Sequence, residues 1–176
     1  MSDKASYEQR IMRTLKELGI PATFATQSKI PMQIESDTLV SIGLDMLQRE
    51  QRMEPRAAAQ WQVMVAAAAQ DGVILAPVSA FRSFDYQRCI IERKLAAGQS
   101  HDKIFRVSAV PGFSEHHTGR AIDIGTPGYS ELTEDFETTP AFAWLTRRAG
   151  EFGFSLSYPR DNPLGIVYEP WHWLYQ

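Results

Sequence analysis

SEHHTGRAID, residues 114–123, is the most informative segment of this 176-residue chain for both its fold and its functional site. It places His116 and Asp123, two side chains that often bind metal ions, seven residues apart, so they are not neighbours on one helix face. Gly119 lies between them and suits a tight turn that brings both side chains toward one point. Residues 120–124 then alternate polar with apolar side chains, which is typical of a half-buried strand.

EPWH, residues 169–172, supplies another histidine and a spare carboxylate near the end of the chain. Zinc enzymes that hydrolyse amides usually bind the metal through three protein ligands and leave a fourth position for water. The two segments therefore predict His116, Asp123 and His172 as the ligands of one zinc ion per chain. Glu169 would be the base that takes a proton from the water. The proline that follows Glu169 predicts a bend between this base and the last ligand, because proline disfavours regular strand pairing.

The same residues also have a purely structural interpretation. The chain contains four histidines, and a single histidine is more often a hydrogen-bonded structural residue than a metal ligand. His117, next to a predicted ligand, is expected to have such a structural role, and His101 is assigned no role. Trp171 and Trp173 are equally typical of an ordinary core. The joint occurrence of the two segments is what favours a metal site.

The two segments match a known family. The first resembles the S-x-H-x-x-G-x-A-x-D signature of the VanY-like zinc D-alanyl-D-alanine carboxypeptidases, with all five fixed positions present. The run YEPWHW at 168–173 is similar to the segment that ends the catalytic domain in that family. A third run, SAFRSFDYQ at 79–87, is similar to its S-G-Y-R-S-x-x-x-Q segment, with Ala80 in place of glycine and Phe81 in place of tyrosine. The resemblance covers residues 55–176 and departs from the family at no predicted ligand.

The resemblance also implies roles for residues outside the ligand set. Arg82 is expected to stabilise the oxyanion that forms when the peptide carbonyl is attacked, because a guanidinium is always charged and can donate two hydrogen bonds. Its alternative is an ordinary salt bridge. Ser114 and Gln87 are expected to bind the substrate, and Tyr158 is a further candidate. Without the resemblance, Ser114 would be interpreted as a turn-forming hydroxyl and Gln87 as an exposed helix residue.

The function implied by the resemblance is zinc-dependent hydrolysis of the C-terminal D-Ala peptide bond of peptidoglycan stem peptides or their precursors. An L,D-carboxypeptidase or a peptidoglycan endopeptidase on the same zinc centre stays open, because that choice depends on the segments 99–113 and 126–138 around the site. A non-catalytic zinc-holding module is a third alternative. Glu169 argues against it, since structural zinc sites usually close with four Cys or His ligands.

Composition excludes several other classes of protein. The net charge is −3 and no basic patch stands out, so nucleic acid is not an expected partner. Cys89 is the single cysteine, which rules out a disulfide within the chain. No segment is apolar enough to span a membrane, and residues 1–10 lack the features of a secretory signal. The expected location is cytoplasmic if the chain is complete, and periplasmic or extracellular if a leader was removed. The oligomeric state does not follow from the sequence.

The order of expected elements favours an α+β fold, with helices packed on a small antiparallel sheet that carries the zinc site. We expect one domain over 1–176, with a helical N-terminal extension (1–54) and a catalytic core (55–176). The expected helices start near Tyr7 and at Asp37, Pro55, Ser83 and Thr139, with the second covering 37–51. The segment 99–113 is expected to be a loop. The expected strands cover 73–80, 120–124, 152–158 and 166–169.

Overall fold

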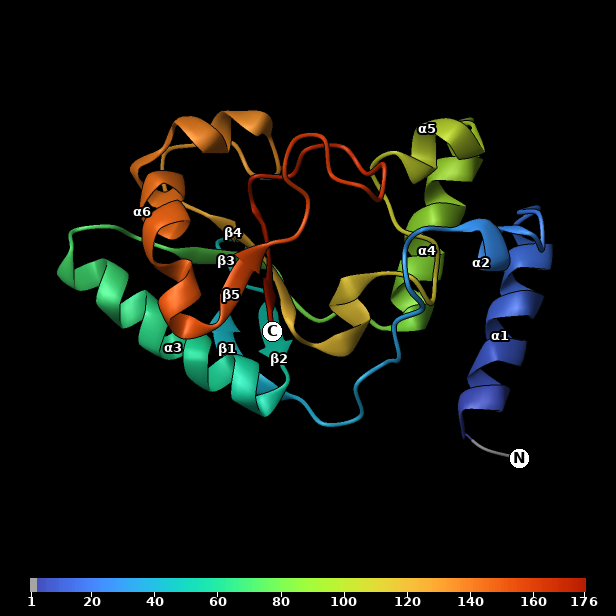
Figure 1. Ribbon diagram of the computed structural model, residues 1–176, viewed down its shortest axis with the longest axis horizontal. Helices are drawn as coiled ribbons and strands as arrows, with labels where there is room; N and C mark the ends of the chain where they lie inside the picture. The colour runs from blue at the N-terminus through green and yellow to red at the C-terminus, as the bar shows by residue number, and fades with distance from the viewer. Residues whose placement is uncertain (1–2) are drawn as a thin grey trace.

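The computed structural model describes residues 3–176 and shows helices grouped around a small antiparallel sheet (Figure 1). The helices are α1 (Asp3–Glu17), α2 (Phe24–Gln27), α3 (Pro55–Gln70), α4 (Phe84–Ala96), α5 (His101–Phe105) and α6 (Pro140–Arg148). The strands are β1 (Val40–Leu44), β2 (Glu50–Met53), β3 (Ala76–Ser79), β4 (Ala121–Gly125), β5 (Phe154–Leu156) and β6 (His172–Tyr175). Three short 3-10 helices complete the set: η1 (Glu115–Thr118), η2 (Glu134–Thr138) and η3 (Ala149–Phe152). The expected α+β class is confirmed.

The strands form two antiparallel sheets of unequal size. β1 pairs with β2 in a hairpin, and the larger sheet has the order β3-β4-β6-β5. β4 is an inner strand of that sheet, and all five of its residues are buried. In the pairing of β4 with β6, Ala121 lies opposite Leu174 and Asp123 lies opposite His172. The sheet itself therefore brings together two residues that are far apart in the sequence.

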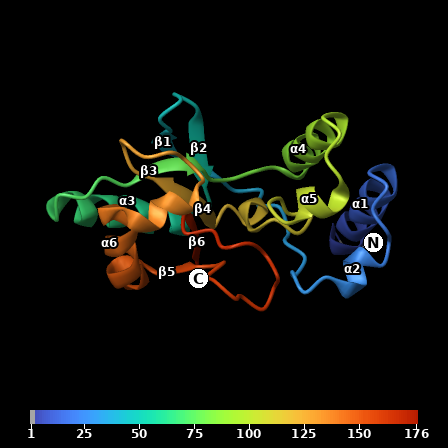
Figure 2. The ribbon, with the colours of Figure 1, turned by 90° about the horizontal axis from the view of Figure 1, so that it is seen from above.

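Two hydrophobic clusters lie toward opposite ends of the molecule (Figure 2). One joins α3 and α6 to the larger sheet and includes the buried side chains of Trp61, Ile122 and Trp144. The other joins α1 to α4 and α5 and includes Leu15 and Ile91. The segment η1 lies between these two groups in both ribbon views. His116 and His117 on this segment are buried, which favours a fixed geometry of both side chains.

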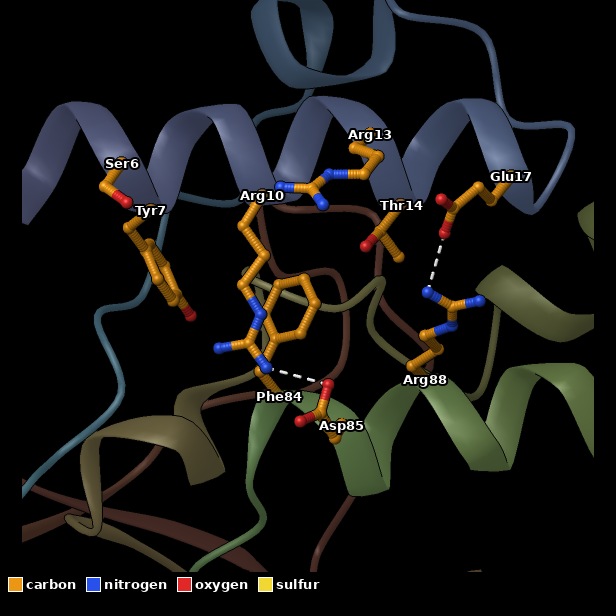
Figure 3. A pocket seen from close by; sticks show the side chains of 9 residues that line it. All are labelled: Ser6, Tyr7, Arg10, Arg13, Thr14, Glu17, Phe84, Asp85 and Arg88. Atoms are coloured by element: carbon orange, nitrogen blue, oxygen red, sulfur yellow. Dashed lines mark hydrogen bonds and ion pairs between the residues drawn. The ribbon is translucent and has the colours of Figure 1, made fainter.

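The N-terminal helix α1 docks on α4 through a mixed contact (Figure 3). Arg10 stacks over the Phe84 ring at 4.2 Å and pairs with Asp85 at 2.7 Å, while Arg88 pairs with Glu17 at 2.6 Å. Exposed ion pairs of this kind contribute only about 0–1 kcal/mol each. Each fully buried aliphatic side chain of α1 contributes about 1.5–3 kcal/mol. The apolar face therefore holds the helix, and the ion pairs orient it.

Local sequence signals explain where the main helices begin. α3 starts with Pro55 in its first turn, and the preceding Glu54 accepts hydrogen bonds from two of its free backbone N–H groups. Ser83 caps α4 by accepting a hydrogen bond from the backbone N–H of Tyr86. Thr139 caps α6 in the same way. The helix starts expected at residues 55, 83 and 139 are therefore confirmed.

The helix expected over 37–51 is wrong. This segment forms most of the β1–β2 hairpin, so the N-terminal extension is helical only in α1 and α2. Asp45 is the physical reason, because its carboxylate accepts hydrogen bonds from the backbone N–H groups of Leu47 and Arg49. Such local bonds compete with helical ones and favour a turn. The apolar spacing that favoured a helix was misleading, since Leu47 is 63% exposed.

Two further expectations need correction. The segment 166–169 is not a strand, because the last strand is β6, which begins at His172. The Asn162 side chain holds the loop before this segment by donating to Ile166 O, and Glu169 N donates to Tyr158 O without a strand being formed. The loop expected over 99–113 contains the short helix α5, which Ser100 caps. No helix within residues 3–176 has the length and apolar character needed to cross a membrane.

Candidate metal centre and active site

The turn at Gly119 connects the two halves of the first motif. Gly119 ends η1 with a φ of +68°, a left-handed conformation that glycine adopts without strain. A Cβ at this position would lie 2.9 Å from the backbone nitrogen of Glu54 and from a side-chain carbon of Leu39. The glycine is therefore required both by conformation and by space. It turns the chain from η1, which carries His116, into β4, which carries Asp123.

The three expected ligands converge on one point. His172 Nδ1 lies 2.9 Å from Asp123 Oδ1, and His116 Nε2 lies 3.3 Å from Asp123 Oδ2. One possible ligand atom from each of the three residues lies within 4.8 Å of the others. All three side chains are buried. The structure thus contains a candidate metal site made of two imidazoles and one carboxylate.

The hydrogen bonds of His116 show that a cation fits this site. Its Nδ1 lies 2.6 Å from the carbonyl oxygen of Ala80, which can only accept, so Nδ1 carries the proton. Burial, with Arg82 nearby, lowers the pKa of His116 to about 4, so the ring is neutral near pH 7. Its Nε2 is buried without a hydrogen-bond partner and faces an oxygen of Asp123. Two acceptors that face each other are stabilised by a positive ion between them.

The ring of His172 is held from its far side by Glu115. His172 Nε2 lies 2.8 Å from Glu115 Oε2, which leaves Nδ1 facing Asp123. Burial acts to lower the pKa of His172, but hydrogen bonds to Asp123 and Glu115 outweigh it and raise the pKa to about 10. Glu115 is not indicated by the sequence. Its only signal is its position beside His116, since nothing in the spacing shows that residue 115 reaches residue 172.

Glu169 lies at the open side of the candidate site. Its Oε2 is 3.9 Å from His172 Nδ1, and the backbone N–H of His172 donates to Glu169 O at 3.1 Å. The chain therefore bends at Pro170, as the sequence predicts. Burial raises the pKa of Glu169 to about 7. A carboxylate with such a pKa is well suited to exchange protons near neutral pH.

Arg82 is positioned beside the candidate site by several contacts. Its Nη2 lies 3.6 Å from Asp123 Oδ2, and its Nη1 donates to Gln87 Oε1 at 3.2 Å. His117, expected to be structural, donates from Nδ1 to the backbone carbonyl of Arg82 at 2.6 Å. Gln87 is fully buried and also donates to Ala109 O. Gln87 is therefore a buried residue that accepts a hydrogen bond from Arg82. It is not the exposed helix residue of the alternative interpretation.

Two cavities of very different size flank the site. A small one of about 50 Å³ is lined by Ser114, Tyr158 and His172, among others. The ring of Tyr158 stacks on His172 with 4.7 Å between centroids, and burial raises the pKa of the Tyr158 hydroxyl, so it stays protonated. The other is an open groove of about 830 Å³ whose walls include Asp123 and Glu169. Ser114 and Tyr158 thus line the small cavity together with His116 and His172, two of the expected metal ligands.

The comparison with protein families agrees with this geometry. A family model described as VanY, D-alanyl-D-alanine carboxypeptidase, matches residues 50–176. The chain belongs to the VanY family. The matched region contains all of η1, β4 and β6, and therefore every residue of the candidate site. It begins five residues before the core expected from the motifs, because it includes β2.

Individual relatives of this VanY family member were also found. The putative carboxypeptidase YodJ of Bacillus subtilis (strain 168) is 30% identical over 163 residues, which are 91% of this chain and 57% of that protein. The chain therefore spans little more than half the length of this relative. The structure of the LdcB LD-carboxypeptidase is similar with a TM-score of 0.72 and 33% identity, covering 82% of this chain and 71% of that one. A variant of the D,D-pentapeptidase VanY in complex with Zn(II) is similar with a TM-score of 0.59 and 27% identity, covering 85% and 80%.

Proposed function

We propose that this protein is a zinc-dependent D,D-carboxypeptidase that removes the C-terminal D-Ala from peptidoglycan stem peptides or their precursors. One observation carries the proposal: the buried imidazoles of His116 and His172 meet Asp123 at a point that Glu169 borders. Membership of the VanY family supports it. A structural zinc site would need no spare carboxylate with a raised pKa beside it, so a non-catalytic module fits the geometry less well.

We propose one zinc ion per chain, held by His116 Nε2, Asp123 and His172 Nδ1. Two imidazoles and one carboxylate are a common ligand set of catalytic zinc, and the related VanY variant was solved with Zn(II). When bound, zinc polarises the peptide carbonyl and lowers the pKa of a water molecule. Ala80 O and Glu115 accept from the far nitrogens of the two rings, which fixes the ring nitrogens that face the metal.

Each of the surrounding side chains would then have a separate role in the reaction. Glu169 accepts a proton from the attacking water and delivers it to the leaving amine of D-Ala. Arg82 donates hydrogen bonds to the oxygen of the attacked carbonyl, where negative charge develops. Gln87, which the sequence analysis assigned to the substrate, acts in this proposal by holding the guanidinium of Arg82. Ser114 and Tyr158 bind the substrate from the small cavity.

The unequal cavities favour a carboxypeptidase over an endopeptidase. A carboxypeptidase needs room for a single residue beyond the cleaved bond, and it needs an open groove for the rest of the peptide. The small cavity beside Ser114 and the large groove beside Arg82 match these two requirements. An endopeptidase would need open space on both sides of the site.

An L,D-carboxypeptidase is the second candidate, because the LdcB structure has a higher TM-score and identity than the VanY variant. The two activities differ in the configuration of the residue before the cleaved bond. Incubation of the zinc-loaded protein with tri-, tetra- and pentapeptide stems, followed by mass analysis, separates them. We expect loss of one alanine from the pentapeptide. Cleavage of the tetrapeptide alone would support the L,D activity, and no cleavage of any stem would contradict both.

A further inference from the structure

Lys94 on α4 is a half-buried cation without an acidic partner. Its Nζ lies 2.6 Å from Ser108 Oγ, and no ion pair of Lys94 occurs among residues 3–176. By contrast, Arg10, Arg88 and other basic side chains of the described chain pair with carboxylates. Burial and the nearby charge of Arg82 lower the pKa of Lys94.

This cation lies next to the proposed active site. Lys94 and Ser108 line the large groove, whose walls also include Arg82 and Glu169. Ser108, Arg82 and Glu169 line the small cavity as well, so Lys94 is placed near the junction of the two cavities. Glu131 lines the groove too, but it forms no ion pair with Lys94 in the described structure. The positive charge at this junction is therefore available to a ligand.

We propose that Lys94 and Ser108 bind a carboxylate of the substrate, a role that rests on the peptidase function proposed above. The ammonium has three N–H donors, and one of them is used by Ser108 Oγ. Because Ser108 accepts that bond, its own O–H is left to donate. A carboxylate placed there receives charge-assisted bonds from Lys94 and a hydroxyl bond from Ser108.

Two carboxylates of a wall peptide have this chemistry. One is the C-terminal carboxylate of the residue that is released. The other is a side-chain carboxylate on a residue before the cleaved bond, which would lie in the groove. Both present the same anionic group to Lys94, and synthetic peptides that carry either one alone distinguish them.

The test is a charge-deletion cycle between the protein and the peptide. Lys94→Met keeps the length of the side chain and removes its charge, Lys94→Arg keeps the charge, and Lys103→Met on the exposed surface of α5 is the matched control. The peptides carry a C-terminal carboxylate or amide, combined with an acidic or neutral side chain at the third residue. kcat/KM is measured for each pair, and thermal unfolding confirms that the variants fold.

We expect Lys94→Met to lower kcat/KM about 10-fold or more on peptides that carry the recognised carboxylate, since bonds to charged groups are of that strength. Peptides without it should be affected little, Lys94→Arg should retain the selectivity, and Lys103→Met should behave as the parent. Loss confined to C-terminal acids assigns the terminal carboxylate, and loss confined to acidic side chains assigns the other. An equal loss on all peptides, or no loss on any, contradicts the proposal.

Binding provides a second readout that does not depend on turnover. Dissociation constants of the same peptides are measured by calorimetry with the Lys94 variants in a zinc-loaded Glu169→Gln background. The same carboxylate-dependent weakening is expected there. If the parent cleaves no peptide, the proposed function fails, and the binding measurement alone then supports or overturns carboxylate recognition by Lys94. If cleavage is normal and binding is insensitive to Lys94, only the present proposal fails.

Discussion

Glu115 Oε2 accepts a hydrogen bond from Nε2 of His172 at 2.8 Å, across 57 residues of sequence. The other ring nitrogen, Nδ1, faces Asp123 at 2.9 Å. A carboxylate in this position fixes which nitrogen carries a proton and makes the opposite nitrogen a better metal ligand. In the proposed zinc site, Glu115 would therefore prepare His172 for the metal ion without contacting the metal position itself.

The role of Glu115 predicts graded zinc affinities. Glu115→Ala should weaken zinc binding about 10–100-fold, because the ring loses its fixed orientation and its charged acceptor. Glu115→Gln should weaken it less, since the amide oxygen still accepts from Nε2. Competition with a chromogenic chelator measures both, and Glu8→Gln on the exposed side of α1 is the control. Equal affinities for all four proteins would refute this role.

Glu169 is predicted to transfer protons and to have no part in binding the metal. Glu169→Gln should lower kcat by about 10²–10⁴-fold, because the amide keeps the shape but cannot accept a proton. Zinc content, measured by elemental analysis, should stay at the level of the parent, whereas His172→Ala should lose both metal and activity. A nearly fully active Glu169→Gln protein would mean that another group is the base.

Arg82 and Gln87 are predicted to act as one unit. Arg82→Ala should lower kcat by about 10²–10³-fold with little change in zinc affinity, because bonds to the oxyanion are strongest in the transition state. Gln87→Leu should lower kcat in the same direction, since it releases the guanidinium. Adding Gln87→Leu to Arg82→Ala should have no further effect. Additive losses in this double-mutant cycle would show that Gln87 acts independently of Arg82.

Gly119 is predicted to be required for stability. Gly119→Ala should destabilise the fold by more than about 1 kcal/mol, since alanine is strained at this φ and its Cβ would contact the Glu54 backbone. Gly98→Ala is the matched control, because Gly98 also has a positive φ but has nothing within 4 Å of the added Cβ. Urea denaturation compares the two. Equal losses would show that only the conformation matters and that the contact with Glu54 does not.

The sequence alone indicated the three residues that meet in the candidate metal site, because each motif keeps its metal-binding side chains within a few positions. Gly119 marked the turn, and His116 and Asp123 flank it on either side. How His172 reaches them was not predictable, since the pairing of β4 with β6 is a long-range contact. The segment 166–169 was expected to be the closing strand, whereas the pairing strand starts three residues beyond it.

Contacts that depend on tertiary structure were the main omission. The hydrogen bonds that His172 donates to Glu115 and that His116 donates to Ala80 O join segments that only the fold brings together. The apolar spacing over 37–51 predicts a helix, whereas the hydrogen bonds that Asp45 accepts favour a turn, and most of this segment forms the hairpin. Local signals such as the Ser83 cap, by contrast, were reliable, since the cap and its helix are adjacent in the chain.

Zinc titration of the metal-stripped protein, with release of D-Ala from a pentapeptide stem followed at each step, tests the central claim most directly. We expect no activity without metal, a linear rise in activity with added zinc, and a break at one zinc per chain. The His116→Ala, Asp123→Ala and His172→Ala variants should remain inactive at the same zinc concentrations. Full activity of the stripped protein, or a zinc-loaded protein that releases no D-Ala, would show that the proposed zinc-dependent function is wrong.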